Sequence, residues 1–366
     1  MGFMAEDELA DLEHKILTGE RLSMEDGIRL YQSKNLLAIG RLADAARCAK
    51  NGDLVYFIVN RHINHTNVCE NLCEFCAFGH EANHPRAYTM TLDQVEEKAL
   101  ASAGEGVSEI HIVGGLNKEL KLDYYVEMLR RVRKALPGVK IQSFTAVEID
   151  FLAGLHDMTV TDVLAALMEA GLDSLPGGGA EVFAPRVREL VCPKKISGER
   201  WLEIHMAAHG LGMRTNATML YGHVETIPER VEHLMQLREA QDKTGGFLTF
   251  IPLAFHPDNT RLKNRISNTT TGFDDLKALA VARLMLDNFQ HIKAFWIMIG
   301  PKLAQISLSF GVDDLDGTVV EERIAHDAGA ITGQFMAKTE LINLIKEAGR
   351  VPVERDTLYN VIGEGF

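Results

Sequence analysis

Cysteine and positive charge are both scarce in this chain, and each shortage excludes a class of protein. Five cysteines among 366 residues are too few for a small domain held together by disulfides. The 51 acidic residues outnumber the 38 lysines and arginines, so the formal net charge is −13. This balance argues against nucleic acid as a partner, because phosphate binding requires a basic face. An anionic small molecule remains compatible with it, since one pocket can be locally positive.

Long apolar runs and a leader-like N-terminus are also missing. No apolar stretch approaches the roughly 20 residues that a membrane-spanning helix requires. The first 13 residues carry five carboxylates, whereas a secretory signal begins with basic residues followed by an apolar segment. We therefore expect a cytoplasmic protein with no membrane partner.

Short apolar runs alternate with longer amphipathic ones through most of the chain. Residues 1–52 are predicted to form three helices, the first over Ala5–Thr18, and thus an N-terminal helical cap. Eight strands are predicted between residues 53 and 336, and these are Tyr56–Ile63, Glu109–Val113, Val139–Thr145, Leu172–Leu175, Met213–Leu220, Phe247–Leu253, Ile292–Ile299 and Ser309–Val312. Residues 337–366 are predicted to be a C-terminal helix and tail.

Eight strand–helix units indicate an α/β fold of the (β/α)8 TIM-barrel type, with a cap before it and an extension after it. An open, doubly wound parallel sheet is the alternative. In a parallel barrel the chemistry lies in the loops that follow the strands. The distinctive residues of this sequence occur in such loops: three cysteines after the first strand, Gly114 and Gly115 after the second, and His256 after the sixth.

The three clustered cysteines stand in the sequence Cys69-Glu-Asn-Leu-Cys73-Glu-Phe-Cys76. Such clustering indicates a metal site before a disulfide, and soft thiolates select iron–sulfur clusters, zinc or Cu(I). A structural zinc site has four protein ligands, whereas this loop supplies three. Three cysteines on a four-iron cluster leave one iron open, where the amino and carboxylate groups of S-adenosylmethionine (SAM) can bind.

This C-x3-C-x2-C spacing, with Phe75 before the last cysteine, is typical of the radical SAM superfamily. The resemblance implies a [4Fe–4S] cluster on Cys69, Cys73 and Cys76 that cleaves SAM to a 5′-deoxyadenosyl radical, with Phe75 beside the cofactor. A zinc-stabilised, non-radical binding module or hydrolase is the alternative. Its Cys3His site would take its fourth ligand from His62, His65, His80 or His84.

Other residues that follow strands are candidates for contacts with SAM. Gly114 and Gly115 leave the backbone open, so that the SAM amino group can bond to carbonyls; an ordinary turn is the alternative interpretation. Glu148 and Glu181 are candidates for the ribose or the amino group, with a solvent-exposed glutamate as the alternative. Leu116 stands where many superfamily members have an acidic residue, so that part of the pattern is missing.

Three further features are assigned no catalytic role. The pair His205-x3-His209 lacks the glutamate of a zinc-protease helix, so we expect both rings to pack or to cap. The run Asp313-Asp-Leu-Asp316-Gly lacks the alternating ligands of a calcium loop. We expect an acidic loop at the barrel mouth there, with a substrate-side role left open. Cys192 is expected to be structural.

Over nearly its whole length the sequence resembles the menaquinone and deazaflavin branch of the superfamily. The segment Asn60-Arg-His-Ile-Asn-His-Thr-Asn67 carries this resemblance into the cysteine loop. The branch includes aminofutalosine synthases, dehypoxanthine futalosine cyclases and a deazaflavin synthase subunit. The synthases are favoured by five later segments, residues 142–149, 171–181, 216–223, 251–257 and 313–318.

Resemblance to the synthases implies that the radical adds to the enolpyruvyl double bond of 3-[(1-carboxyvinyl)oxy]benzoate. Aryl migration and loss of the carboxylate as CO2 or bicarbonate then give 6-amino-6-deoxyfutalosine, a step of menaquinone biosynthesis. A hydrogen-abstracting sibling, the cyclase or the deazaflavin synthase subunit, is the alternative and would release free 5′-deoxyadenosine. A flavodoxin or ferredoxin is expected as electron donor. No general base is predicted, and the substrate anchors are expected among Arg61, His62, Asn64, Asn216 and His256.

Overall fold

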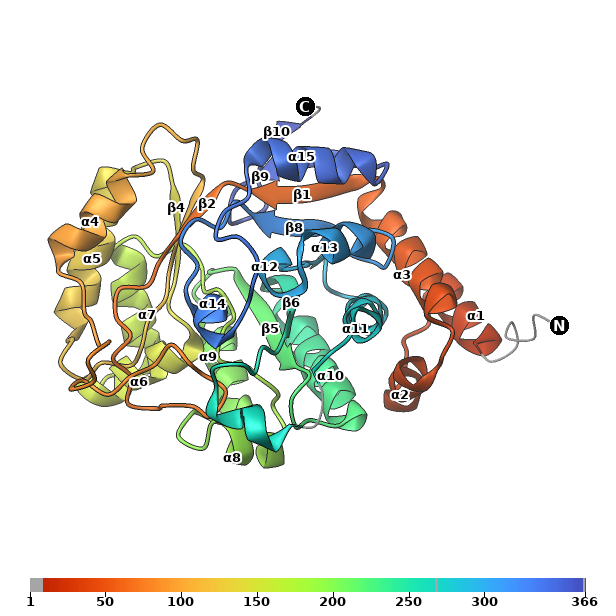
Figure 1. Cartoon of the computed structure of the whole chain (residues 1–366), viewed down its shortest axis with the longest axis horizontal. Coiled ribbons are helices and arrows are strands. Elements are labelled where there is room, and N and C mark those ends of the chain that lie inside the picture. The colour runs from red at the N-terminus through yellow and green to blue at the C-terminus, as the bar shows by residue number, and fades with distance from the viewer. Residues whose placement is uncertain (1–8, 267–268, 365) are drawn as a thin grey trace.

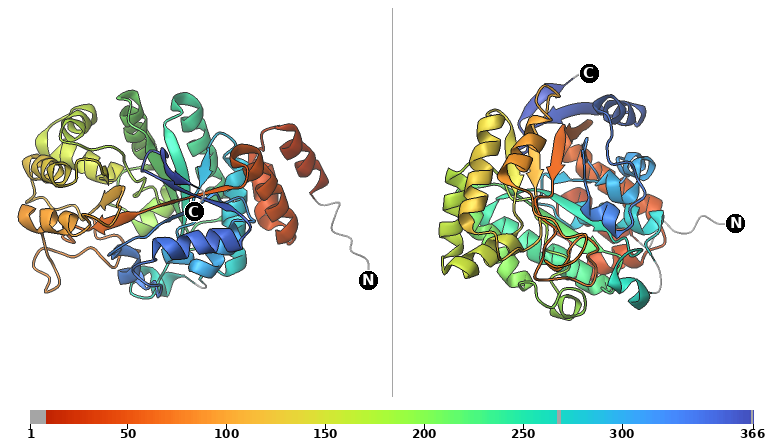
Figure 2. Two further views of the ribbon diagram at one scale, coloured as in Figure 1. Left: turned by 90° about the horizontal axis from the view of Figure 1, so that it is seen from above. Right: turned by 60° about the vertical axis from the view of Figure 1, so that its left-hand side comes forward.

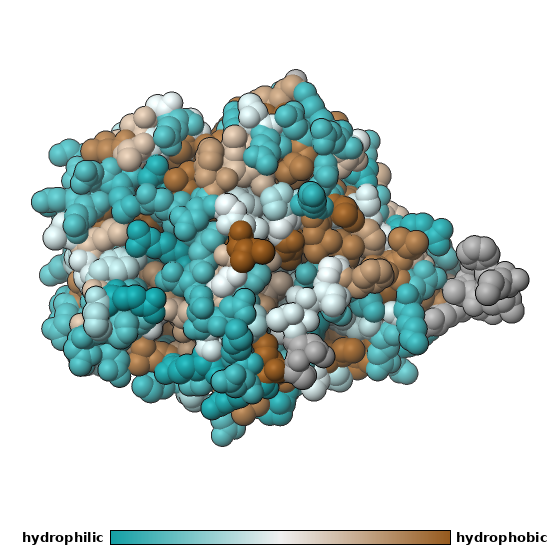
Figure 3. Space-filling view, viewed as in Figure 1, coloured by the Kyte–Doolittle hydropathy of each residue, from teal (hydrophilic) through white to brown (hydrophobic). Residues whose placement is uncertain are grey.

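The computed structural model describes residues 9–266, 269–364 and 366. A ring of strands surrounded by helices forms its centre (Figures 1 and 2). Three helices stand beside the ring, and these are α1 (Ala10–Thr18), α2 (Met24–Gln32) and α3 (Leu36–Asn51). The part of the first predicted helix before residue 9 lies outside the described residues. Polar residues cover most of the face seen in Figure 3.

Eight segments close the ring, because its first two strands form one continuous segment and the residues around Ser174 contribute another. Its strands are β1 (Leu54–Ile58), β2 (Asn60–Ile63), β3 (Glu109–Ile112), β4 (Lys140–Ser143), β5 (Thr215–Tyr221), β6 (Phe247–Ala254), β7 (His291–Ile292) and β8 (Asp314–Gly317). Parallel pairing joins β2–β3–β4, β5–β6–β7 and β8–β1. Single bridges from Gln142 to Ser174 and from Lys293 to Asp314 join these groups, and the Asn216 amide donates to the Leu175 carbonyl at 3.0 Å. The predicted (β/α)8 barrel is confirmed.

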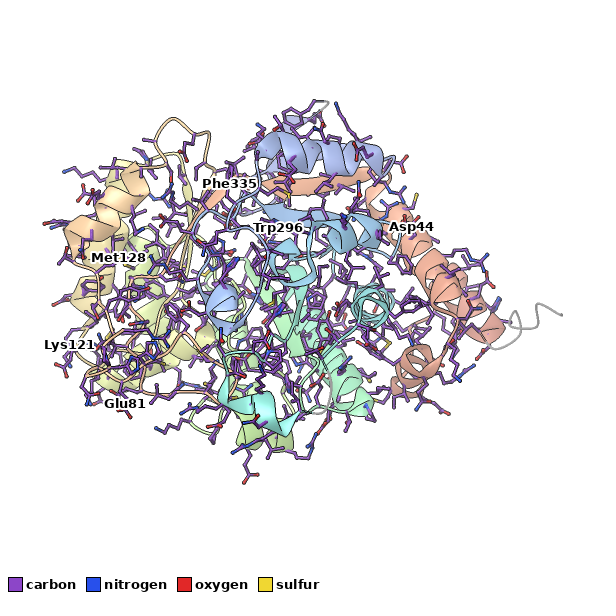
Figure 4. The ribbon with its side chains drawn as sticks, viewed as in Figure 1. Asp44, Glu81, Lys121, Met128, Trp296 and Phe335 are labelled. Carbon is purple, nitrogen blue, oxygen red and sulfur yellow. The ribbon has the colours of Figure 1, made fainter. Side chains whose placement is uncertain are left out.

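Helices follow the strands, and most of them form the outer layer of the barrel. They are α4 (Leu92–Leu100), α5 (Leu122–Ala135), α6 (Ala146–His156), α7 (Val160–Glu169), α8 (Pro185–Val191), α9 (Gly198–Gly210), α10 (Ile227–Thr244), the 3-10 turn η1 (Arg261–Arg265), α11 (Gly272–Met285), α12 (Trp296–Ile299), α13 (Pro301–Ser307), α14 (Ile324–Ala328) and α15 (Lys338–Glu347). A capping box between Thr91 and Gln94 begins α4. Trp296, labelled in Figure 4, joins α12 to β8 by donating to the Gly317 carbonyl at 2.8 Å.

Four of the predicted strands differ from the structure. The first is divided at Val59 into β1 and β2. The fourth shrinks to the bridge at Ser174, and the seventh ends after Ile292 because α12 follows. The eighth is wrong, since the chain turns over residues 309–312 and the strand lies at Asp314–Gly317. A search for apolar runs misses β8, because this buried strand contains aspartates. Cations from distant segments compensate their charge.

The aspartates at β8 are therefore not an acidic loop at the barrel mouth. Asp313 is fully buried and accepts hydrogen bonds from the Asn51 side chain at 2.9 Å and the Ile292 amide at 2.8 Å. It also forms a buried ion pair with Arg283. Asp314 accepts from Arg355 Nε and from the Tyr359 hydroxyl, both at 2.7 Å. These bonds connect the N-terminal helices, the barrel and the C-terminal segment.

The predicted C-terminal tail is a β-hairpin. Strand β9 (Val351–Arg355) pairs in parallel with β1, and β10 (Val361–Glu364) pairs antiparallel with β9. Figure 1 shows this hairpin and α15 together at one side of the barrel. The division at residues 52 and 336 stays a prediction. Among the described residues no single helix is long and apolar enough to cross a bilayer. Only the pair α6–α7 reaches the necessary length and apolar composition when taken together, and it is bent by 107°.

Removing the cation that faces Asp314 should weaken the whole fold. The Arg355→Met variant leaves a buried carboxylate without its partner, and we expect a loss of about 3–5 kcal/mol in the free energy of unfolding. Urea unfolding followed by circular dichroism measures this loss. The control is Arg131→Met, whose partner Asp93 is 89% exposed, and we expect at most about 1 kcal/mol there. Equal effects of the two substitutions would contradict the assignment.

Candidate active site

One cavity of about 310 Å³ runs along the inside of the barrel. Asn60 and Glu109, the first residues of β2 and β3, line its inner end, and Gly114 and Gly115 line its outer end just after β3. Gly114 comes five positions after Glu109, which corresponds to roughly 16 Å along a strand. The cavity therefore connects the interior of the barrel to the loops at the carboxyl ends of the strands.

The cysteine loop forms part of the outer end of this cavity. Cys69, Cys73 and Cys76 all line it, and none of them forms a disulfide. The Cys69 amide donates to the His80 carbonyl at 2.9 Å. The Gly79 amide donates to Cys76 Sγ at 3.4 Å, a bond that favours the thiolate. The structure thus brings the three predicted ligands together at one rim.

Gly79 is a residue of this loop that the sequence analysis missed. The sulfur atoms of Cys69 and Cys76 lie 4.0 and 3.8 Å from the place where a Cβ atom on Gly79 would stand. The same Cβ atom would stand 3.3 Å from the Cys69 Cβ atom, so a larger residue would crowd this ligand. A glycine three positions after the last cysteine was the available signal.

The donor set fits a cluster better than a single ion. Among the described residues no group of three or more His, Cys, Asp or Glu side chains could hold one metal ion. His65 is buried against Gly114 without a polar partner, and the His80 and His84 rings stack on each other at 4.1 Å. The Cys3His zinc interpretation therefore lacks its donor set in the described chain. Three soft thiolates around one rim suit a larger iron–sulfur cluster.

Burial favours the protonated form of two thiols of the cysteine loop. It raises the pKa of Cys73 to about 12, and it also raises the pKa of Cys76. Metal ligation requires the thiolate, so loading of the site releases protons.

Gly114 and Gly115 let two loops approach closely. A Cβ atom on Gly115 would stand 2.2 Å from the Val68 carbonyl oxygen, and one on Gly114 would stand 2.5 Å from the His65 ring. Both glycines are therefore required to pack the loop after β3 against the cysteine loop. Both also line the cavity, so the packing and the predicted contact with SAM are compatible.

Glu148 joins α6 to the loop after β3. It forms a capping box with Thr145, whose amide donates to Glu148 Oε2 at 2.7 Å, and its other oxygen accepts from the Gly114 amide at 3.2 Å. The side chain lines the cavity and is buried rather than solvent-exposed. Burial raises the pKa of this carboxyl group to about 7.

Glu181 forms a buried ion pair with Lys195, and both residues line the cavity. Burial acts to lower the pKa of Lys195, but the neighbouring Glu181 carboxylate raises it overall. Lys195 Nζ also lies 4.9 Å from the centre of the Phe75 ring, within the range of a cation–π contact. Sequence reasoning missed Lys195, because a lysine in a loop reads as a solvated side chain.

The predicted substrate anchors divide into two groups. His62 and His256 line the cavity, and His256 Nε2 is 2.9 Å from the Met298 carbonyl. Arg61, Asn64 and Asn216 do not line it, so their role as anchors stays a prediction.

The position of each of these three residues has a structural reason. Arg61 alternates with His62 along β2 and points outward, 3.8 Å from Glu321. Asn64 donates to the Val113 carbonyl at 3.1 Å. Asn216 has the same strand parity as the cavity-lining Thr218, but it lies one layer further from the carboxyl end of β5.

The inner end of the cavity carries polar residues, of which the sequence analysis missed Lys293 and His111. Lys293 Nζ donates to Asp316 Oδ1 at 3.1 Å, and both side chains are at most 10% exposed. The His111 ring stacks on His62 with centroids 4.4 Å apart. All four line the cavity. No sequence motif marks Lys293 or His111, because the fold brings them together from the end of β7 and from β3.

Two of the features given no catalytic role, the histidine pair and Cys192, lie outside the cavity. His205 and His209 both approach the Thr215 hydroxyl, at 2.9 and 2.8 Å, as packing residues would. Cys192 is buried and does not line the cavity.

The raised pKa of Glu148 predicts a pH-dependent stability. Its protonated form stabilises the fold fully below its ordinary pKa of 4.5, and this contribution is lost as the pH rises through about 7. Gln at position 148 keeps the capping box but does not ionise. Relative to Glu148→Gln, the wild-type protein should lose up to about 3 kcal/mol between pH 5 and pH 8. Urea midpoints of the cluster-free proteins measure this, and parallel pH curves would refute it.

Two family models match the chain. Residues 63–237 match the model of the Radical SAM superfamily. Residues 244–364 match the model described as the CofH/MqnC C-terminal region. The first match contains the cysteine loop, and the second contains η1, β6 to β8 and the C-terminal hairpin.

Solved structures support the fold alone. Methylornithine synthase aligns with a TM-score of 0.74 at 18% identity, over 93% of this chain and 97% of that one. The hydrogenase maturase HydG from Carboxydothermus hydrogenoformans aligns with a TM-score of 0.75 at 16% identity, over 97% of this chain and 81% of that one.

Curated relatives share nearly the full length. The aminodeoxyfutalosine synthase of Thermus thermophilus is 47% identical over 97% of this chain and 96% of its own. That of Streptomyces coelicolor is 44% identical over 97% and 94%. An archaeal relative, the 5-amino-6-(D-ribitylamino)uracil–L-tyrosine 4-hydroxyphenyl transferase of Archaeoglobus fulgidus, is 40% identical over 90% and 95%. The chain therefore belongs to the aminodeoxyfutalosine synthase family within the radical SAM superfamily.

Proposed function

We propose that this protein is an aminodeoxyfutalosine synthase. It joins the adenosyl group of SAM to 3-[(1-carboxyvinyl)oxy]benzoate with loss of CO2 or bicarbonate, and it serves menaquinone biosynthesis. The observation that carries the proposal is the single cavity that has three cysteine thiols at its outer end and a polar cluster at its inner end. Identity of 47% to a synthase over almost the whole chain favours this reaction over that of the archaeal relatives.

The cofactors are a [4Fe–4S] cluster and SAM, which is also a co-substrate. We assign the cluster to Cys69, Cys73 and Cys76. Bound there, the cluster would supply the electron for reductive cleavage of SAM to methionine and a 5′-deoxyadenosyl radical. The residues proposed to contact SAM are Phe75, Gly114, Gly115, Glu148 and Glu181. Glu148 and Glu181 are held by bonds to Gly114 and Lys195, so their carboxylates are oriented before SAM binds.

The protein's own task is positioning. Radical addition needs little proton transfer, so the walls of the cavity have to hold the vinyl carbon near the adenosyl group and exclude water. Apolar side chains serve this purpose along the middle of the cavity, and they include Val113, Leu220, Leu253, Phe255 and Phe295. His62 and His256 are the sequence-predicted anchors that we retain for the anionic substrate.

The direct test is anaerobic incubation of the reconstituted protein with SAM, dithionite and the enolpyruvyl oxybenzoate, read by mass spectrometry. We expect an adenosyl–substrate adduct that has lost CO2. Free 5′-deoxyadenosine without adduct would keep the radical SAM assignment and indicate a hydrogen-abstracting reaction. Intact SAM beside a reducible cluster would refute the proposal. The Cys73→Ala variant, which removes one proposed cluster ligand, is the control for background cleavage.

We further propose that a flavodoxin or ferredoxin supplies the electron in the cytoplasm, where thiols stay reduced. Exposed basic residues form a rim beside the cysteine loop, and these are Lys118, Lys194, Arg261 and Arg265. Lys118 lies 3.3 Å from the Glu70 carboxylate, and Lys194 donates to the Glu70 carbonyl at 3.3 Å. In a chain with a net charge of −13, this rim is suited to an acidic carrier.

Reversing two charges of the rim should slow electron delivery. The Lys118→Glu/Lys194→Glu variant should react about tenfold more slowly with a reduced flavodoxin or ferredoxin at low salt, because steering is lost. With dithionite its rate should stay close to that of the wild-type protein. Stopped-flow absorbance of the cluster measures both rates, and Lys346→Glu on α15 is the matched control. Equal rates with the protein donor would contradict the docking assignment.

A further inference from the structure

The inner end of the cavity contains a buried cation that the proposed function has not yet used. Lys293 follows β7, its amide donates to the Phe250 carbonyl at 2.9 Å, and it forms a bridge to Asp314. Its side chain is 7% exposed and pairs with Asp316, which is 10% exposed. Lys195, the other lysine that lines the cavity, lies at the outer end beside Phe75.

Stability alone does not account for this pair. Buried ion pairs cost so much desolvation that apolar residues of similar size are often as stable or more stable. Asp316 also adopts a left-handed backbone conformation with φ of 64°, which costs energy for a residue with a side chain. Its amide donates to Asp314 Oδ1 at 2.6 Å, which holds that conformation. A costly pair that faces an open cavity indicates a ligand.

The surroundings of Lys293 suit a carboxylate. Asp316 accepts one of the three ammonium donors and leaves the others available. The stacked rings of His62 and His111 line the same end. Burial lowers the pKa of both rings and the charge of Lys293 lowers it further, so both are neutral at pH 7 and each keeps one N–H donor.

The acidic neighbours of Lys293 are already engaged. Glu109 accepts from Asn60 Nδ2 at 3.3 Å and from the Thr357 hydroxyl at 2.9 Å. Asp314 is bound by Arg355 and Tyr359.

The length of the cavity orients the substrate. The reacting vinyl carbon has to meet the adenosyl group, and the cysteines place that group at the outer end. The ring carboxylate stands at the opposite end of the substrate, across the benzene ring, and therefore points toward the inner end. A carboxylate buried there needs a compensating cation.

We propose that Lys293 binds the ring carboxylate of the substrate, with His62 and His111 as additional donors and Asp316 as the residue that positions the ammonium group. The inference rests on the proposed function, because it takes the substrate from there. It assigns the specificity for an aryl carboxylate to the inner end of the cavity.

The test compares two ligands and two proteins at binding equilibrium, without reductant. The ligands are the enolpyruvyl oxybenzoate and 2-phenoxyacrylate, which lacks only the ring carboxylate. Isothermal titration calorimetry of the SAM-loaded wild-type protein should show a preference of about tenfold to one hundredfold for the first ligand. In Lys293→Met/Asp316→Asn this preference should fall below about threefold. The double variant removes both charges, so that no unpaired carboxylate is left buried.

Two controls separate binding from folding. Lys293→Arg keeps the cation and should keep most of the preference. Lys277→Met removes a lysine that donates to the Tyr31 and Ser33 carbonyls, at 3.0 and 2.7 Å, outside the cavity. It should leave the preference unchanged. A double variant that folds, binds 2-phenoxyacrylate normally and still prefers the ring carboxylate would overturn the proposal.

Failure of the proposed function has a different signature. In that case the wild-type protein forms no adduct in the turnover assay, whatever its ligand preference. If the wild-type protein forms the adduct while its preference does not depend on Lys293, only the anchor is refuted.

Discussion

Closure of the parallel strands into a ring is the constraint on which the rest of the structure depends. In a closed ring alternate side chains of every strand share one interior, and the carboxyl ends of all strands meet at one rim. His62, His111 and Gln142 occupy the same register of β2, β3 and β4. All three line the cavity, so this side of the interior is polar where a packed barrel would be apolar. The ring thereby forms a site from residues that are far apart in the sequence.

The outer end depends on how closely two backbones approach. The loop after β3 lies against the cysteine loop because Gly115 has no Cβ atom to collide with Val68, and Gly79 leaves room beside two cysteine sulfurs. Glu148 ties the loop after β3 to the first turn of α6. These three local contacts, at Gly115, Gly79 and Glu148, determine the position of the loop that carries the thiols. The basic residues of the proposed docking surface border the same loop. The same part of the structure therefore serves ligand binding and electron delivery.

The sequence analysis predicted the features that short segments encode, and it missed the contacts between side chains from different strands. The cysteine spacing and the glycine pair each lie within a short segment, and the strand–helix alternation repeats from one segment to the next. These patterns predicted the barrel and the end of it that carries the site. They also predicted the cavity-lining residues Glu148, Glu181, His62 and His256. Lys195 and Lys293 read as solvated lysines, because their partners Glu181 and Asp316 are brought to them only by the fold. Strand β8 was misplaced for the same reason, since its aspartates meet their cations from β9 and the end of β7.

The distribution of charge along the cavity follows from the reaction that we propose. A carbon-centred radical reacts with whatever hydrogen donor it meets, so the middle of the cavity has to be apolar and dry, and the charges that recognise ligands have to stand at its ends. The two ion pairs that line the cavity agree with this requirement. Lys195–Glu181 lies beside the cysteine loop, and Lys293–Asp316 lies at the inner end. Each lysine is neutralised by a carboxylate before ligand binds, which limits the cost of keeping a cation in a buried site. A ligand carboxylate then adds to an existing pair and meets an ammonium group whose position is already determined. Binding energy is thus available to align the substrate along the barrel axis, which is the contribution that a radical addition requires from its protein.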